Sequence, residues 1–146
     1  MIAIGSDHAA YEFKEEIKQF LDEKGIAYKD FGTHSTDRAD YPLFGEKVAQ
    51  VVAGGESLKG LLFCGTGVGI SIAANKVRGI RAVVGSEPYS AKLSRLHNDT
   101  NILALGARVV GIELAKMIIE VWLETPFEGG RHGERVMMIG EIEAER

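Results

Sequence analysis

The stretch Gly60-Leu61-Leu62-Phe63-Cys64-Gly65-Thr66-Gly67-Val68-Gly69-Ile70-Ser71 decides the fold. Its apolar residues 61–64 are typical of a strand buried on both faces of a sheet, although so short a run also fits a piece of buried helix. Three glycines at alternate positions then permit a sharp turn that brings backbone N–H groups against a ligand, and residues 70–76 have helical character. The single cysteine, Cys64, stands at this corner, where a helix N-terminus stabilises a thiolate.

Short apolar strands alternate with amphipathic helices along the rest of the chain. In the first helix, Phe13, Ile17, Phe20 and Leu21 form one apolar stripe. We expect strands at about 2–5, 26–31, 61–64, 80–84 and 102–105, and helices at about 9–24, 42–53, 70–76, 87–97, 111–124 and 131–143. This alternation predicts a single α/β domain over 1–146: a three-layer α/β/α sandwich with a five-stranded parallel, Rossmann-like, doubly wound sheet and a C-terminal helix.

Composition narrows the class of protein further. A chain of 146 residues is long enough to bury about 70% of its unfolded surface without stabilising disulfides or metals. One cysteine excludes an internal disulfide and fits a reducing compartment. A net charge of −4 disfavours a nucleic-acid or membrane-surface role. The longest uncharged run, 60–75, is shorter than the roughly 20 residues of a spanning helix. Because the chain begins directly with a strand, we expect no signal peptide and a cytoplasmic location.

Ligands of such folds bind beyond the carboxyl ends of the strands, which directs attention to the glycine loop. Ile70 excludes a P-loop, a dinucleotide fingerprint and a C-x5-R phosphatase loop, because each requires a different residue at that position. What remains is a thiol facing backbone amides. Such a thiol can act as a nucleophile or general base while the amides stabilise an oxyanion. A buried structural cysteine beside a tight turn is the alternative.

Other polar residues follow strands or end helices, and each has a purely structural alternative. Asp7 and His8 follow the first strand and could orient a substrate hydroxyl, although an Asp here also suits capping of the next helix. His97 could move protons near neutral pH, but a helix C-terminus also favours a histidine. Arg131 and Arg135 lie one helical turn apart and could clamp a phosphate.

The alternative for the two arginines is a surface ion pair of Arg135 with Glu128 or Glu134. The four histidines and the cysteine show no metal-ligand spacing, so we expect no metal.

Taken together, these motifs resemble the type B ribose-5-phosphate isomerase family, which also contains the galactose-6-phosphate isomerase subunits. The matching segments span nearly the whole chain in order: Gly5-Ser6-Asp7-His8-Ala9, Asp40-Tyr41-Pro42, Cys64-Gly65-Thr66-Gly67-Val68-Gly69 with Ser71 to Lys76, His97-Asn98-Asp99 with Asn101, Leu105-Gly106 with Arg108, and Gly130-Arg131-His132 with Arg135.

The resemblance implies an aldose–ketose isomerase of the pentose phosphate pathway that interconverts ribose 5-phosphate and ribulose 5-phosphate without metal or cofactor. Cys64 would take the C2 proton to give a cis-enediolate, and His97 with Asp7 would open the furanose ring. Thr66 and the amides around Gly65, Gly67 and Gly69 would hold the oxyanion. The phosphate would be bound by His8, Arg108, Arg131 and Arg135, and the sugar by Tyr41, Ser71 and Asn98.

The resemblance also implies a homodimer with shared active sites, or a dimer of dimers, in which His97, Asn98 and Arg108 come from the neighbouring subunit. Some family members use a carboxylate base instead of the cysteine, and we assign this chain to the cysteine group. The expected partners are thus a sugar phosphate and a second copy of the chain, with neither nucleic acid nor membrane. A hexose 6-phosphate isomerase of the allose or galactose type and a non-catalytic sugar-phosphate sensor remain as alternatives.

Overall fold

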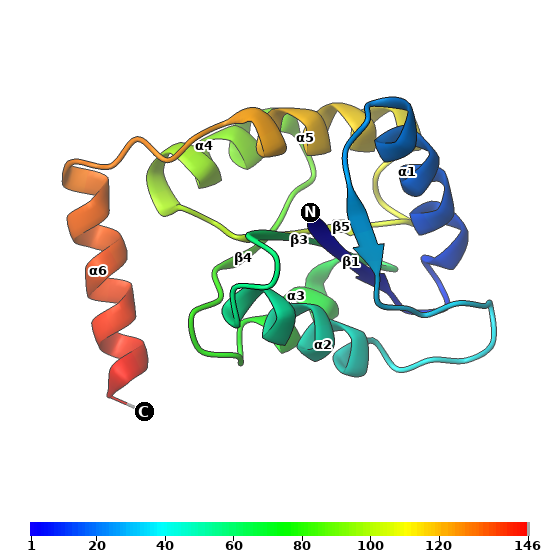
Figure 1. Ribbon diagram of the computed structural model, residues 1–146, viewed down its shortest axis with the longest axis horizontal. Coiled ribbons are helices and arrows are strands. Elements are labelled where there is room, and N and C mark those ends of the chain that lie inside the picture. Colours follow the sequence, from blue (N-terminus) through cyan, green and yellow to red (C-terminus); the bar gives the residue numbers. More distant parts are fainter. Residues whose placement is uncertain (146) are drawn as a thin grey trace.

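A computed structural model describes residues 1–145 and shows one all-parallel sheet of five strands in the order β2-β1-β3-β5-β4 (Figure 1). The strands are β1 Ile2–Ser6, β2 Tyr28–Asp30, β3 Lys59–Cys64, β4 Ala82–Val84 and β5 Ile102–Gly106. The helices are α1 Tyr11–Glu23, α2 Tyr41–Ala53, α3 Val68–Ala74, α4 Pro88–Asn98, α5 Ile112–Glu124 and α6 Arg131–Ala144. The predicted α/β architecture with a C-terminal helix is confirmed.

The sheet is covered on both faces, as the apolar runs of its strands require. Ile4 of β1 faces one cluster, built with α1, α4 and α5, whereas the preceding Ala3 faces a second cluster with α2 and α3. Figure 1 shows α1, α4 and α5 above the sheet and α2 and α3 below it. Because neighbouring strand residues point to opposite faces, burial of both Ala3 and Ile4 explains why residues 2–4 of β1 are all apolar.

The carboxyl ends of three strands lie side by side at the middle of the sheet. Ser6 of β1 pairs with Phe63 of β3, and Cys64 pairs with Gly106 of β5. The chain leaves β1 toward β2 on one side, and β3 then joins β1 on the other side. The strand order therefore reverses between β1 and β3, where ligands of open parallel sheets bind.

The edge strands are shorter than expected. Ile26 is bound to the end of α1, since its N–H donates to the Leu21 carbonyl at 2.9 Å, so β2 begins only at Tyr28. Likewise Ile80 closes a turn onto Val77 at 3.2 Å, and β4 begins only at Ala82.

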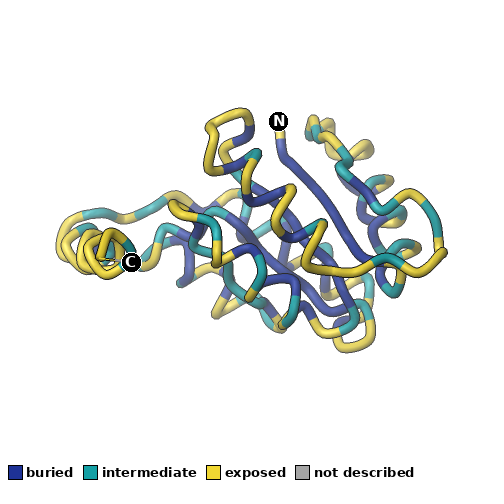
Figure 2. The backbone as a smooth tube through the Cα atoms, turned by 90° about the horizontal axis from the view of Figure 1, so that it is seen from below, coloured by how far each residue is buried: buried dark blue, intermediate teal, exposed yellow. Residues whose placement is uncertain are grey.

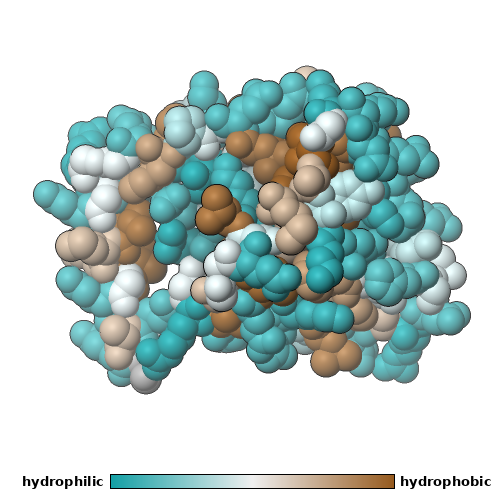
Figure 3. Space-filling view, in the orientation of Figure 1, coloured by the Kyte–Doolittle hydropathy of each residue, from teal (hydrophilic) through white to brown (hydrophobic). Residues whose placement is uncertain are grey.

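Helix α6 lies to one side of the three layers and packs against α4 (Figure 1). In Figure 2 it is seen end-on at the left and is largely exposed, in contrast to the buried central strands. Four large apolar side chains of α6 are 47–66% exposed: Met137, Met138, Ile139 and Ile142. Apolar side chains accordingly show at the left of Figure 3, over α6.

Within residues 1–145, every helix is too short or too polar to cross a bilayer.

Candidate active site

A cleft of about 370 Å³ opens at the carboxyl ends of the central strands. It combines residues that follow β1, β3 and β5 with one from the start of α2. The lining residues are Asp7, Tyr41, Cys64, Gly65, Thr66, Val68, Gly69 and Arg108. Seven of these eight, all except Val68, are among the predicted site residues.

Cys64 ends β3 with its side chain almost enclosed, at 4% exposure. The backbone N–H of Gly67 donates to its Sγ at 3.1 Å. The sulfur is thus a hydrogen-bond acceptor held at the floor of an open cleft, free of any disulfide. Cys64 belongs both to the core cluster beside α2 and α3 and to the lining of the cleft, so its position fits the structural alternative as well as the predicted proton acceptor.

The glycine loop is pressed against the end of β5, and two glycines make this possible. Gly67 has φ +81°, and a Cβ there would lie 2.9 Å from the Leu105 carbonyl carbon. A Cβ on Gly106 would lie only 2.6 Å from the Thr66 backbone. The two backbones therefore meet without side chains between them, which fixes the height of the loop above the sheet. Thr66 closes the turn, its Oγ1 accepting the Val68 N–H at 3.2 Å.

Asp7 and Tyr41 also line the cleft. The buried Asp7 carboxylate accepts the N–H of Ala10 at 3.2 Å, so the structural role considered for it, at the entry to α1, is real. Because its carboxyl also lines the cleft, that role does not exclude contact with a ligand. The ring of Tyr41 lies so close to Gly69 that a Cβ there would approach it to 2.7 Å.

Arg108 lines the cleft of its own chain. Its N–H donates to the Gly65 carbonyl at 3.0 Å, and its Nη1 would lie 3.4 Å from a Cβ on Gly65. The tight turn after β5 binds residue 108 back onto the loop after β3. Within the one chain described, the guanidinium adjoins the glycine loop of the same chain, and the expectation that Arg108 serves a neighbouring subunit's site stays a prediction.

His8 is exposed and oriented through Nδ1, which lies 3.0 Å from the Ala39 carbonyl and 3.1 Å from the Ala39 N–H. The loop that carries Ala39 is in turn held by a buried lysine, Lys14, whose ammonium donates to Asp30 at 2.7 Å and to the Thr33 carbonyl. Burial lowers the pKa of Lys14 despite the nearby carboxylate. Burial by itself raises the pKa of Asp30, but the hydrogen bond from Lys14 and that from the Gly32 N–H outweigh it and lower this pKa.

The sequence reasoning missed Lys14. A signal was available, since Lys14 occupies the apolar face of α1 one turn after Ala10 and one turn before Ile17, both fully buried.

Ser71 does not line the cleft. Its hydroxyl is buried and donates to the Val68 carbonyl at 2.8 Å, within its own helix. The predicted role of Ser71 is therefore at most indirect in this geometry. Gly67 contributes through its N–H, as described for Cys64.

The remaining predicted residues form a second group, on α4 and α6. His97 stacks on His132 with ring centroids 4.1 Å apart and an interplanar angle of 13°. Glu128 lies 4.0 Å from Nε2 of each ring, and not against Arg135 as the ion-pair alternative required. Burial and then the neighbouring His97 lower the pKa of His132. Asn98, Arg131 and Arg135 are exposed beside this group.

These residues lie outside the cleft of Cys64 within one chain. The structure therefore assembles the predicted site residues into two groups and does not join them.

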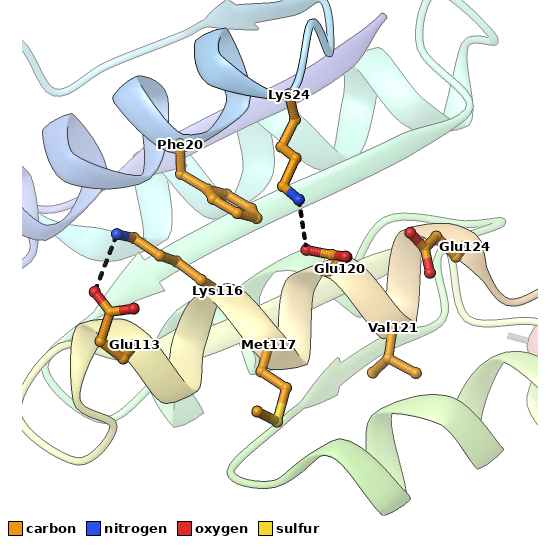
Figure 4. A pocket seen from close by; sticks show the side chains of 8 residues that line it. All are labelled: Phe20, Lys24, Glu113, Lys116, Met117, Glu120, Val121 and Glu124. Carbon is orange, nitrogen blue, oxygen red and sulfur yellow. Dashed lines mark hydrogen bonds and ion pairs between the residues drawn. The ribbon is translucent and has the colours of Figure 1, made fainter.

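A larger groove, of about 440 Å³, lies between α1 and α5 (Figure 4). Four of its five charged side chains are paired with each other, Lys24 with Glu120 at 3.3 Å and Lys116 with Glu113 at 3.2 Å, and the fifth is Glu124. It contains neither a thiol nor a histidine. We therefore place the candidate active site at the smaller cleft.

Comparison with known proteins identifies the family of the chain. The profile of the family described as Ribose/Galactose Isomerase matches residues 2–139. The chain belongs to this family. It is 60% identical to ribose-5-phosphate isomerase B of Escherichia coli over 99% of this chain and 97% of that protein. It is also 43% identical to a D-erythrulose-4-phosphate isomerase of Pectobacterium atrosepticum, over 97% and 94% of the two chains.

Among solved structures, Clostridium thermocellum ribose-5-phosphate isomerase B superposes with a TM-score of 0.97 at 57% identity, covering 99% of this chain and 97% of that one. This TM-score over almost the whole chain shows that the two proteins share the same backbone fold.

Proposed function

We propose that this chain is an aldose–ketose isomerase that interconverts ribose 5-phosphate and ribulose 5-phosphate. The observation that carries the proposal is the cleft in which a single thiol, a carboxylate and a guanidinium meet a glycine loop, in a chain 60% identical to an Escherichia coli enzyme of that name. The chemistry requires a proton to move between C1 and C2 beside a carbonyl, which a positioned base and an oxyanion site can promote.

In this proposal Cys64 takes the C2 proton as a thiolate, and the enediolate oxygen forms hydrogen bonds with Thr66 and with amides of residues 65–69. Sγ already accepts one N–H of this loop, which supports the sulfur as the site of negative charge. Asp7 would hold a substrate hydroxyl, and its burial in the lining of the cleft supports this role. The proton then returns to C1 from the same sulfur, while the hydroxyl proton on O2 passes to O1, so aldose and ketose have the same atoms and nothing else is consumed.

Ring opening and phosphate binding are assigned to the second group, supplied by a neighbouring chain. His97 would move the ring-opening proton, while Arg131 and Arg135 would clamp the phosphate with His8. Support comes from the two exposed arginines: no ion pair or hydrogen bond involves either guanidinium within residues 1–145. We propose that two chains complete each other's sites. A cytoplasmic location belongs to the same proposal and is supported by the single free cysteine.

The first experiment follows formation of ribulose 5-phosphate from ribose 5-phosphate, with EDTA present, for the wild type and Cys64→Ser. We expect turnover in the wild type and a loss of about 10²–10⁴-fold in kcat for the variant, the usual contribution of a general base. Substrate binding should remain, since the phosphate groups are untouched. Wild-type turnover by Cys64→Ser would reject the base. Inactivity of both would direct the assay to four- and six-carbon sugar phosphates, and binding without turnover of any would favour the sensor.

Complementation tests the shared site. Cys64→Ser and His97→Asn are each expected to be inactive alone. If the sites are shared, random pairing of the two variants gives about one intact site in four, and activity returns to about a quarter of wild type after the chains are mixed, unfolded and refolded together. If each chain carries its own full site, the mixture stays inactive.

A further inference from the structure

Two imidazoles and one carboxylate meet between the end of α4 and the start of α6. Nε2 of His97 and Nε2 of His132 each lie 4.0 Å from Oε2 of Glu128, and the three ligand atoms all lie within 4.8 Å of one another. Two imidazole nitrogens and one carboxylate oxygen form a common ligand set for zinc, with the fourth position left open. We propose that this His–Glu–His trio binds a zinc-type divalent cation, which inhibits the enzyme by occupying His97.

The buried ring of His132 provides an independent observation. It is 5% exposed, and its Nε2 has neither solvent access nor a hydrogen-bond partner within residues 1–145. A buried polar nitrogen without a partner costs free energy, so its presence at the centre of the trio needs an explanation. A cation bonded to Nε2 would satisfy that nitrogen, whereas the stack on His97 does not.

The geometry of the trio requires a moderate adjustment to bind a cation. Zinc bonds of 2.0–2.2 Å in a tetrahedron place ligand atoms about 3.4 Å apart, compared with 4.0 Å from Glu128 to each ring nitrogen. The rings are nearly parallel, so their in-plane lone pairs must also turn toward one point. His97 has room for this rotation because its side chain is 38% exposed, whereas His132 stays fixed by burial.

Neighbouring charges limit the affinity. Arg131 and Arg135 lie on the same turns of α6 as His132 and repel a cation, whereas the Glu128 carboxylate attracts it. With three protein ligands and two nearby guanidiniums, we expect binding weaker than in a structural zinc site with four protein ligands.

The test measures Zn²⁺ binding by competition with a chromophoric chelator, using the full-length chain with Cys64→Ser so that the thiol does not compete. We expect one Zn²⁺ per chain. Two variants each remove one ligand and should each weaken binding by about tenfold or more. Glu128→Gln keeps the size of the side chain, and His132→Phe keeps both its approximate size and the ring stack on His97. The matched control is His34→Ala, which removes an exposed imidazole outside the trio and should leave the affinity unchanged.

The site is rejected if Zn²⁺ does not bind, or binds with equal affinity when Glu128 or His132 is replaced. Circular dichroism of both variants shows whether a loss of binding is due to unfolding. If both folded variants bind Zn²⁺ more weakly, the assignment does not depend on a single substitution.

Inhibition rests on the proposed function and is measured separately, with wild-type Cys64 in place. Zn²⁺ should inhibit isomerisation of ribose 5-phosphate, EDTA should restore it, and Glu128→Gln should shift the inhibition curve by the same factor as the binding curve. Inhibition that persists unshifted in Glu128→Gln would overturn the inhibitory role. Zinc bound at the trio of a chain without isomerase activity would leave the site standing and reject the proposed function instead.

Discussion

Replacement of Gly106 by alanine tests whether close backbone packing sets the geometry of the cleft. A Cβ at Gly106 would lie 2.6 Å from the carbonyl carbon and oxygen of Thr66. Relief of that contact to an ordinary separation of about 3.4 Å requires the glycine loop to move by about 0.8 Å, and such overpacking costs about 1–3 kcal/mol of stability. For a chain of this size that corresponds to a decrease in Tm of roughly 3–10 °C.

The displacement should also lower activity, because the loop carries the N–H that binds Cys64 Sγ. A shift of about 1 Å in a catalytic group can cost up to about 100-fold, and we expect most of it in kcat. The assay combines thermal unfolding followed by circular dichroism with steady-state kinetics on ribose 5-phosphate.

The matched control is Gly111→Ala, after the same strand, where a Cβ meets nothing within 4 Å. It should change stability by less than about 1 kcal/mol and leave kcat unchanged. An unchanged Tm of the Gly106→Ala protein would refute the claim that the two backbones are too close for a side chain. A lowered Tm with unchanged kcat would refute the claim that this contact positions the catalytic loop.

Three further predictions concern the residues around the cleft and α6. Lys14→Met should lower the free energy of unfolding by about 3 kcal/mol, because it leaves the largely buried Asp30 without its closest cation. Denaturation in urea measures this change. The control is Lys29→Met, which removes an exposed ion pair with Glu56 at 3.9 Å. Because the pKa of His132 is lowered in the folded chain, the unfolded chain binds the proton first. Stability should therefore fall as pH drops below about 6.5, and His132→Phe should remove that part of the pH dependence. Arg135→Gln should raise KM for ribose 5-phosphate about 10–100-fold with little change in kcat, as expected for loss of a charged contact to phosphate; Arg78→Gln serves as a control for general charge, and equal effects of both would contradict the clamp.

The fold was largely predictable because the period of the apolar residues and the positions of the helix-ending glycines agree along the chain. The stripe of α1 and the glycines that end α1 and α2 placed both helices within two residues, and Gly25 and Gly55 do adopt positive φ. The edge strands were overestimated because apolar residues such as Ile26 and Ile80 are equally suited to a turn that packs on the core. Apolarity alone does not distinguish a sheet hydrogen bond from a turn hydrogen bond.

The cleft was predictable from the rule that strand ends converge, since Asp7, Cys64 and Arg108 each follow a central strand. The details within it were not. That Ser71 bonds to its own helix, and that Arg108 adjoins the thiol loop of its own chain, depend on turn geometry that residue types do not encode. The trio of His97, Glu128 and His132 was not predicted, because its members are brought together only by the fold: His97 and Glu128 are 31 positions apart in the sequence.

The exposed helix α6 and the divided site have one common explanation. A helix of 14 residues gains little stability in water from its own hydrogen bonds, yet α6 leaves Met137, Met138, Ile139 and Ile142 exposed. It also carries Arg131 and Arg135, which the cleft of Cys64 in the same described chain does not include. A second chain that covers the apolar face would bury those side chains and could bring an arginine pair to each thiol cleft. The proposed dimer therefore joins stability to activity: loss of pairing by dilution should lower isomerase activity and α6 helicity together. Activity that survives complete dissociation would show that the two groups do not form one site.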